Sequence, residues 1–179
     1  MTTAEPLLGD RLRLLPVQPD DVERLKEIRY SPSVHRWWGS VEAQSWPFDD
    51  PETEMRSMWV ADRLVGFIQW YENDDERYRH AGIDLFVEES AQGQGLGRQA
   101  ITLVMRHLVA RGHHRVVIDP AAGNQRAIAC YRACGFVPVG VMRRYERDVD
   151  GEGWHDGLLM EYVIENESIS RRPMGDLPL

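Results

Sequence analysis

The sequence has 179 residues, of which 42% are hydrophobic and 28% are charged, and its formal net charge is −8. This length predicts one domain with a full hydrophobic core, and the acidic balance argues against a nucleic-acid or anionic-membrane partner. No apolar run reaches membrane-spanning length, and the start "MTTAEPLLGDRLRLL" lacks the basic flank and apolar stretch of a leader, so we expect a cytoplasmic protein that does not enter a membrane.

The spacing of apolar residues predicts a succession of strands and helices along the chain. In chain order the expected elements are a strand at 11–17, a helix at 19–30 begun by Asp20 or Asp21, a short helix within 31–40, a loop at 41–54, hairpin strands at 55–61 and 64–72, a strand at 80–89, a helix at 94–111, a strand at 114–119, a helix from Asn124 to Gly135, and hairpin strands at 136–146 and 154–164. This order predicts a mixed α/β sheet with helices packed on it. Residues 1–164 are therefore expected to form the domain, followed by a partly disordered tail at 165–179.

The segment "AQGQGLG" (91–97) places three glycines between a predicted strand and a predicted helix. Backbone N–H groups at a helix start have no partner within the helix, and the helix dipole is positive there, so such a loop suits a phosphate. Gly97 is followed by Arg98 rather than by the Lys-Ser/Thr of a nucleotide-hydrolase P-loop, and the glycine spacing misses the dinucleotide-binding pattern by one residue. A phosphate loop of another kind and a plain strand-to-helix turn both stay open.

Two motifs together point to one family. Gln92-x-x-Gly95-x-Gly97 resembles the pyrophosphate loop of the GCN5-related N-acetyltransferase superfamily, which binds acetyl-CoA, and "NQRAIACYRACGF" (124–136) is similar to that family's second signature. The resemblance implies a single-domain α/β fold with a mixed, mostly antiparallel central sheet, splayed at the acetyl-CoA site, and helices on both faces. The activity that it implies is acetyl-CoA-dependent N-acetyl transfer.

The resemblance also assigns roles to particular residues. Those implied to bind acetyl-CoA are Leu85, Phe86, Val87, Gln92, Gly93, Gln94, Gly95, Leu96, Gly97, Arg98, Asn124 and Ala127. Tyr131 matches the family's tyrosine that protonates the departing thiolate, which belongs to a thiol with a pKa of ~8.5. On an amphipathic helix, Tyr131 is alternatively a core aromatic residue. The histidines do not cluster at ligand spacing, so no metal is expected.

Three local motifs bear on the acceptor amine. They are "WWG" (37–39), "GID" (82–84) and "DP" (119–120), and together they are similar to the aminoglycoside 6′-N-acetyltransferases. The resemblance implies a cationic small-molecule substrate, whose attacked amine Asp84 would orient or deprotonate. Asp119 would bind a second ammonium, Trp38 would pack on a sugar ring, and Glu72 is implied as a further substrate acid. A cleft-wall role for Trp38 and a turn or cap role for Asp119 are the structural alternatives.

Other parts of the sequence fit that substrate less well. The segment after Gly39 is shorter than in those relatives, and the last hairpin (140–162) looks more like acetyltransferases that act on protein N-termini, of the ribosomal-protein type. An acetyltransferase for a protein N-terminus, a polyamine or a hydroxylated lysine in siderophore synthesis is therefore the alternative. A sensor that binds acyl-CoA without turnover is a third hypothesis, but it needs neither Tyr131 nor Asp84.

Overall fold

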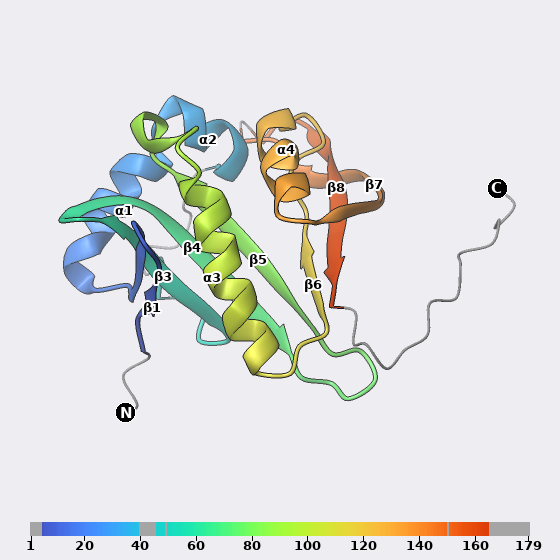
Figure 1. Cartoon of the computed structure of the whole chain (residues 1–179). Helices are drawn as coiled ribbons and strands as arrows, with labels where there is room; N and C mark the ends of the chain where they lie inside the picture. The colour runs from blue at the N-terminus through green and yellow to red at the C-terminus, as the bar shows by residue number, and fades with distance from the viewer. Residues whose placement is uncertain (1–4, 40–45, 49, 150, 165–179) are drawn as a thin grey trace, which may run out of the picture.

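The structure, a computed structural model, describes residues 5–39, 46–48, 50–149 and 151–164. Within these residues the chain forms an eight-stranded sheet in the order β1-β2-β3-β4-β5-β6-β8-β7 (Figure 1). The strands are β1 (Leu7–Leu8), β2 (Arg13–Pro16), β3 (Thr53–Val60), β4 (Arg63–Asn73), β5 (His80–Val87), β6 (Arg115–Ile118), β7 (Val137–Arg147) and β8 (Trp154–Val163). Neighbouring strands are antiparallel except β5 and β6, which are parallel. The expected mixed, mostly antiparallel α/β fold is confirmed.

Helices cover both faces of this sheet. In the described part of the chain the α-helices are α1 (Val22–Arg29), α2 (Pro32–Trp38), α3 (Leu96–Ala110) and α4 (Gln125–Ala133). Successive side chains of a strand point to opposite faces, and β4 shows both environments. Phe67 packs in the core with α1 and α2, whereas Ile68 packs in the core with α3. Figure 1 shows α3 lying across one face, with α1 and α2 on the other side.

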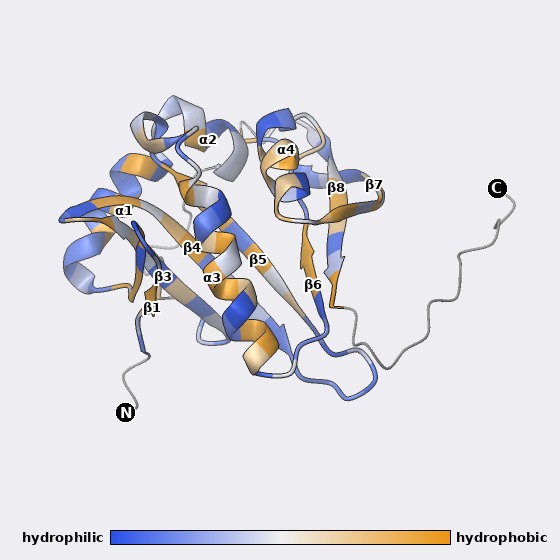
Figure 2. Cartoon of the chain, in the orientation of Figure 1, coloured by the Kyte–Doolittle hydropathy of each residue, from blue (hydrophilic) through white to orange (hydrophobic). Residues whose placement is uncertain are grey.

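The sequence of α3 explains its position. Its fully buried side chains include Ala100, Ile101, Val104 and Leu108, a spacing of three and four residues that lines one face of a helix. Figure 2 shows orange and blue sides on this helix, whereas the turn between β4 and β5 is blue. The apolar side packs against β5 and holds the start of α3 close to the end of that strand.

β5 and β6 separate soon after they meet. Within the described strands they pair at Ala81–Val116 and Gly82–Val117 alone, and Figure 1 shows the two strands diverging beyond these positions. A gap between parallel strands leaves backbone groups without a strand partner. The splay that the sequence resemblance implied is therefore present, and it lies at the end of β5 that leads into the glycine loop.

The backbone N–H and C=O groups of β5 point alternately toward β4 and into this gap. Glu88 N–H donates to Val65 O at 2.7 Å, which shows that even-numbered residues here form hydrogen bonds with β4. In an antiparallel pair the hydrogen-bonded and non-hydrogen-bonded positions alternate. Leu85 and Val87 therefore direct their N–H and C=O groups away from β4 and into the gap.

Several details differ from the sequence-based expectations. β1 is an additional strand that a turn from Gly9 N–H to Leu12 O folds back onto β2, and two residues are too few to show a periodicity. β3 begins at Thr53, inside the segment 41–54 that was expected to be a loop and that lies partly outside the described residues. The expected tail at 165–179 lies wholly outside them. None of the described helices is long and apolar enough to cross a membrane.

Candidate active site

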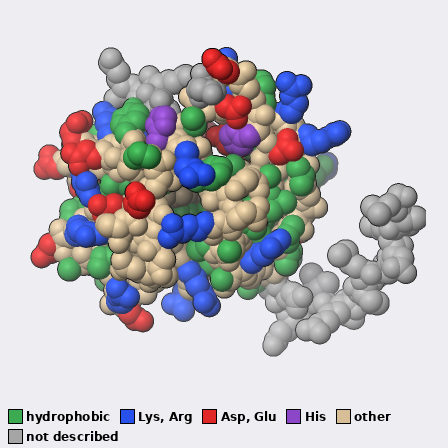
Figure 3. All heavy atoms as spheres, turned by 90° about the horizontal axis from the view of Figure 1, so that it is seen from above, with side chains coloured by type: hydrophobic (Ala, Val, Ile, Leu, Met, Phe, Trp, Pro, Cys, Tyr) green, Lys and Arg blue, Asp and Glu red, His purple; other side chains and the backbone are tan. Residues whose placement is uncertain are grey.

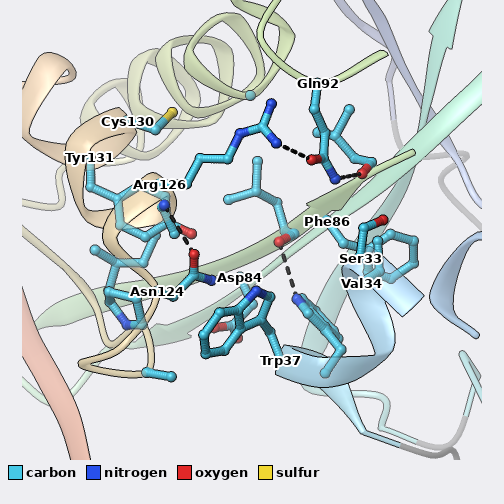
Figure 4. A pocket seen from close by; sticks show the side chains of 18 of the residues that line it. Ser33, Val34, Trp37, Asp84, Phe86, Gln92, Asn124, Arg126, Cys130 and Tyr131 are labelled. Atoms are coloured by element: carbon cyan, nitrogen blue, oxygen red, sulfur yellow. Dashed lines mark hydrogen bonds between the residues drawn. The ribbon is translucent and has the colours of Figure 1, made fainter. Parts of the chain in front are cut away.

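A cleft opens where β5 and β6 diverge. Its volume is about 1230 Å³, and its walls come from α2, the end of β5, the start of α3, the segment from β6 to α4, α4 itself and β7. Figure 4 shows side chains from these elements arranged around it. Figure 3 shows this end of the molecule as spheres, with Lys and Arg side chains across the middle of the face and many Asp and Glu side chains toward its margins.

Most of the residues expected from the sequence line this one cleft. The lining includes Leu85, Phe86, Val87, Gln92, Gly93, Gly95, Leu96, Gly97, Arg98, Asn124, Ala127 and Tyr131, together with Trp38, Asp84 and Asp119. Gln94 was expected to bind acetyl-CoA but is not part of the cleft lining, and its Nε2 donates to Ser90 O at 2.9 Å. The structure thus brings the two motifs together, while the roles of the individual residues stay predictions.

The glycine loop is an open turn at the start of α3. Gly93 and Gly95 have φ angles of +74° and +78°, which side chains disfavour, and Gly95 is the N-cap residue of the helix. A Cβ atom on Gly95 would have no other atom within 4 Å, so the backbone there faces open space. The exposed Arg98 adds a positive charge beside the first turn. Open amides, a helix dipole and a cation are what a phosphate site requires.

Two side chains bind the carbonyl groups that β5 directs into the gap. Trp38 Nε1 donates to Leu85 O at 3.2 Å, and Gln92 Nε2 donates to Val87 O at 2.7 Å (Figure 4). These donors occupy positions that an additional strand would use, which shows that the carbonyl groups can be reached from the gap. An extended chain with amide groups that replaces these donors can pair with this edge in the manner of an added strand.

α4 contributes two residues of the second motif. Asn124 is its N-cap, and Asn124 Oδ1 accepts a hydrogen bond from Ala127 N–H at 3.2 Å. Two turns further along, Tyr131 lines the cleft although its side chain is largely buried. Burial and, next, the charge of Asp84 raise the pKa of Tyr131, so its hydroxyl keeps its proton.

Asp84 lies half-buried in the cleft wall formed by β5. Gln69, its cross-strand neighbour on β4, donates from Nε2 to Asp84 Oδ2 at 3.2 Å. Burial raises the pKa of Asp84 to about 6, and the charges of Asp119 and Glu146 add to this increase. The hydrogen bond from Gln69 opposes it. Asp84 can thus bind and release a proton close to neutral pH.

Asp119 and Glu146 extend the acidic side of the cleft. Tyr145 of β7 lies close to Asp119, and the interaction with this side chain, followed by burial, raises the pKa of Tyr145 to about 12. Glu146 follows directly and also lines the cleft. Sequence reasoning missed Gln69, Tyr145 and Glu146. The register of the β4–β5 hairpin could have identified Gln69, because it places Gln69 opposite Asp84. The positions of Tyr145 and Glu146 depend on how the last hairpin packs, which the sequence does not show.

The two tryptophans of α2 have different surroundings. The Trp38 ring packs edge-on against Phe86, with 4.9 Å between the ring centroids. With its hydrogen bond to Leu85 O, Trp38 is held as part of the cleft wall, which fits the cleft-wall role considered as the alternative to packing on a sugar ring. Trp37 reaches across the cleft, where a Cβ atom on Gly123 would lie 3.7 Å from Trp37 Cη2. Figure 4 shows the Trp37 indole beside Asp84. Trp37 is therefore the indole that faces the acidic side.

Glu72 lies outside the cleft. Its Oε2 accepts a hydrogen bond from Arg111 Nε at 2.8 Å and lies 2.7 Å from His113 Nε2. The expected substrate role of Glu72 is not supported by this position, because Ile68 and Trp70 point to the α3 face and Glu72 continues the same alternation along β4. Glu72, Asp74 and His113 have a spacing that would suit a metal ion. Arg111 and Arg79 already pair with the two carboxylates, so this cluster carries no metal assignment.

Known sequences resemble the chain over much of its length. The model of the acetyltransferase (GNAT) family matches residues 20–136. A mycothiol acetyltransferase of Corynebacterium efficiens is 33% identical over 85 residues, which are 48% of this chain and 28% of that protein. An aminoglycoside N(6′)-acetyltransferase type 1 of Klebsiella pneumoniae is 25% identical over 158 residues, covering 75% of this chain and 78% of that protein. The chain thus spans under a third of the mycothiol relative and most of the aminoglycoside relative.

Solved structures share the fold at low sequence identity. RimL, a ribosomal L7/L12 α-N-protein acetyltransferase, has a TM-score of 0.77 at 20% identity and covers 89% of this chain and 94% of its own. Spermidine N-acetyltransferase from Vibrio cholerae, in complex with CoA and spermine, has a TM-score of 0.72 at 18% identity, with 87% and 96% coverage. AAC(6′)-Ib, in complex with paromomycin and acetyl-CoA, has a TM-score of 0.68 at 22% identity, with 86% and 94% coverage. The named ligands and substrates differ, so these likenesses show the fold and not the acceptor.

Proposed function

Because the chain belongs to the acetyltransferase (GNAT) family, we propose that it transfers the acetyl group of acetyl-CoA to a primary amine of a cationic small molecule, the 6′-amine of an aminoglycoside. One observation carries this proposal. A single cleft joins an open glycine loop at a helix start to the half-buried carboxyl group of Asp84. The loop suits the phosphates of CoA, and the carboxyl group suits an amine that must lose a proton.

The cofactor side of the cleft fits acetyl-CoA. The backbone amides of residues 93–98 lie at the positive end of the α3 dipole, where they can bind a pyrophosphate, whereas the Gln92 N–H donates to Glu89 O at 3.1 Å. Leu85 and Val87 direct N–H groups into the gap, together with C=O groups that accept from Trp38 and Gln92, and this edge can pair with the amides of a pantetheine arm. Bound acetyl-CoA supplies an acetyl group activated as a thioester, and the diverging ends of β5 and β6 leave room for it beside Asp84 and Tyr131.

The residues of the chain then move the protons. An amine attacks only when it is neutral, and above its pKa of about 6 Asp84 is the carboxylate that orients the amine and accepts its proton. As the carbon–nitrogen bond forms and the carbon–sulfur bond breaks, Tyr131 donates its proton to the departing sulfur. The raised pKa of Tyr131 keeps that proton available. The products are an amide and the free thiol of CoA.

The acceptor side favours a substrate with more than one positive charge. Asp84, Asp119 and Glu146 bring three carboxyl groups to this side, and Trp37 faces the same region. In an aminoglycoside, Asp84 would receive the 6′-amine and Asp119 a more distant ammonium group. The similarity to an aminoglycoside N(6′)-acetyltransferase over 75% of this chain supports this choice.

A protein N-terminus is the second candidate acceptor. The likeness to RimL has a TM-score of 0.77, against 0.68 for AAC(6′)-Ib. The hairpin of β7 and β8 beside the acceptor side is also the segment whose sequence resembles enzymes of the ribosomal-protein type. A polyamine or a hydroxylated lysine is a further cationic acceptor that the same carboxyl groups would suit.

Turnover of acetyl-CoA with a panel of amines tests the proposal. Kanamycin, spermidine and a peptide with a free N-terminus are offered separately, and the release of free thiol is followed. We expect the highest kcat/KM with kanamycin. Acetylation of the peptide without acetylation of kanamycin would replace the first acceptor with the second. Binding of acetyl-CoA without turnover of any amine would contradict an enzyme and favour a sensor.

A further inference from the structure

Two hydrogen bonds in series cross the mouth of the cleft. Arg126 Nη1 donates to Gln92 Oε1 at 2.6 Å, and Gln92 Nε2 donates to Val87 O at 2.7 Å. Arg126 is the second residue of α4, whereas Gln92 comes just before the glycine loop. Figure 4 shows the Arg126 side chain extending from α4 toward Gln92, so the two bonds join opposite walls of the cleft.

The guanidinium of Arg126 lies against the glycine loop itself. A Cβ atom on Gly93 would lie 3.5 Å from Arg126 Nη2. Its partner in this position is the neutral amide of Gln92, which leaves the positive charge uncompensated by that bond. A guanidinium binds a phosphate more strongly than a neutral amide, because both partners are charged and the fork of N–H groups matches two oxygen atoms.

The second bond occupies a group that an added strand needs. Val87 directs its C=O into the gap between β5 and β6, where it accepts from Gln92 instead of from a neighbouring strand. A polar group without a partner in a partly buried cleft is costly, so Gln92 keeps this carbonyl satisfied when nothing else lies along β5. The same side chain thus holds both Arg126 and Val87.

We propose that Arg126 and Gln92 form a bridge that the co-substrate replaces, in which Arg126 exchanges the Gln92 amide for the pyrophosphate and Gln92 releases the Val87 carbonyl to an amide N–H of the pantetheine arm. This inference rests on the proposed function, because it assigns a residue to the recognition of acetyl-CoA. Arg126 and the Val87 carbonyl each have a partner before and after the exchange. Arg126 is then the residue that selects a thioester carrying a pyrophosphate over one that lacks it.

Binding of three ligands to the purified protein tests this exchange. CoA and dephospho-CoA are titrated by calorimetry, and pantetheine, which has no pyrophosphate, by chemical-shift changes. Arg126→Gln should weaken CoA and dephospho-CoA equally, by roughly tenfold or more, as expected for a lost hydrogen bond between charged groups. Pantetheine should bind as before. Arg126→Lys, which keeps the charge and loses the fork, should recover part of the affinity.

Arg132→Gln is the matched control, since Arg132 is an exposed arginine of α4 outside the cleft lining. It should bind all three ligands as the wild type does. Wild-type CoA affinity in Arg126→Gln would overturn the inference, and so would a loss for CoA that dephospho-CoA does not share. Equal weakening of pantetheine would show that Arg126 only supports the fold. A wild-type protein that binds no CoA would contradict the proposed function itself, which separates the two failures.

Discussion

Asp84 is the residue at which stability and the proposed chemistry conflict. Burial, with the charges of Asp119 and Glu146, raises its pKa to about 6 from an ordinary value of ~3.9. The folded state therefore holds this proton more tightly than the unfolded state. The free energy of unfolding accordingly decreases as the pH rises from about 4 to about 6, and it stays lower above that range.

Replacing this carboxyl group should therefore stabilise the protein while it removes activity. Asp84→Asn is expected to raise the stability at pH 8 by about 1 kcal/mol, allowing for the solvent that reaches the cleft, or Tm by roughly 2–4 °C. Its kcat should fall by roughly 10²- to 10⁴-fold. Thermal melts between pH 4.5 and 8 check the first effect, with Asp62→Asn at the exposed β3–β4 turn as control. A gain of equal size at pH 4.5 and pH 8 would contradict the ionisation argument.

Gln69 is expected to set the pH at which Asp84 becomes active. Its amide N–H stabilises the ionised carboxylate and so lowers the pKa of Asp84 relative to burial alone. In the wild type, kcat/KM should rise with pH through about 6 as Asp84 loses its proton. Gln69→Leu should move this rise to higher pH, because the carboxylate loses its donor. A pH profile of kcat/KM measures the shift, and an unchanged profile would show that Gln69 only packs beside Asp84.

At the scale of elements, substitutions at the start of α3 can distinguish the effect of backbone conformation on CoA binding from the effect of charge. Gly95 has a φ of +78°, and a side chain there would meet no atom within 4 Å, so the fold offers room but an unusual backbone angle. Asn and Asp tolerate this angle about equally and differ mainly in charge. Gly95→Asp should weaken CoA binding at least ~10-fold more than Gly95→Asn, because a carboxylate would face the phosphates. Equal affinities in the two folded variants would mean that no phosphate lies at this loop.

The hairpin of β7 and β8 offers a similar test for the acceptor side. A Cβ atom on Gly157 would lie 2.8 Å from Tyr145 Cδ1, so Gly157→Ala should displace Tyr145 from Asp119. We expect a several-fold higher KM for the cationic acceptor, because Asp119 would lose its contact with Tyr145, with CoA affinity unchanged. Gly140→Ala in the same hairpin is the control, because a Cβ atom there would meet nothing within 4 Å. Steady-state kinetics of both variants decide whether Tyr145 positions Asp119.

For the whole molecule, the cleft carries charges of both signs. Arg98 and Arg126 lie at the glycine loop, Asp84, Asp119 and Glu146 lie on the other side, and the lining also includes Arg29, Arg36 and Glu89. An anionic co-substrate and a cationic acceptor would therefore enter one cavity through regions of opposite charge. The net charge of −8 favours the approach of the cation over the whole surface as well.

The dependence of the acceptor KM on salt concentration tests this arrangement of charges. The KM of a polycationic acceptor is expected to increase between 50 and 300 mM salt more steeply than the KM of a monoamine, because several charge pairs are screened together. Initial rates at saturating acetyl-CoA, measured with kanamycin and with a simple monoamine, provide the comparison. Identical salt dependence for the two acceptors would mean that Asp119 and Glu146 make no ion pairs with substrate.

The sequence by itself predicted the fold class, and it predicted the residues of the cofactor side, most of which the structure brings to one cleft. The periods of two and of three to four residues define strands and helices wherever one side is buried, as in α3. The glycine loop and the Asn124 cap are local as well, since each depends on residues within one or two turns of chain. Motifs of this kind can be read before any long-range contact is known. Very short elements such as β1 carry no such signal.

Only the tertiary structure decided which distant side chains meet. Gln69 lies opposite Asp84 because of the register between β4 and β5, while Glu72, on the same strand, points to the other face. The contacts of Arg126 with Gln92 and of Tyr145 with Asp119 depend on how α4 and the last hairpin pack across the splayed sheet. A shift of one residue along a strand reverses the face of every side chain, so composition and spacing leave these contacts undetermined until the strands are paired.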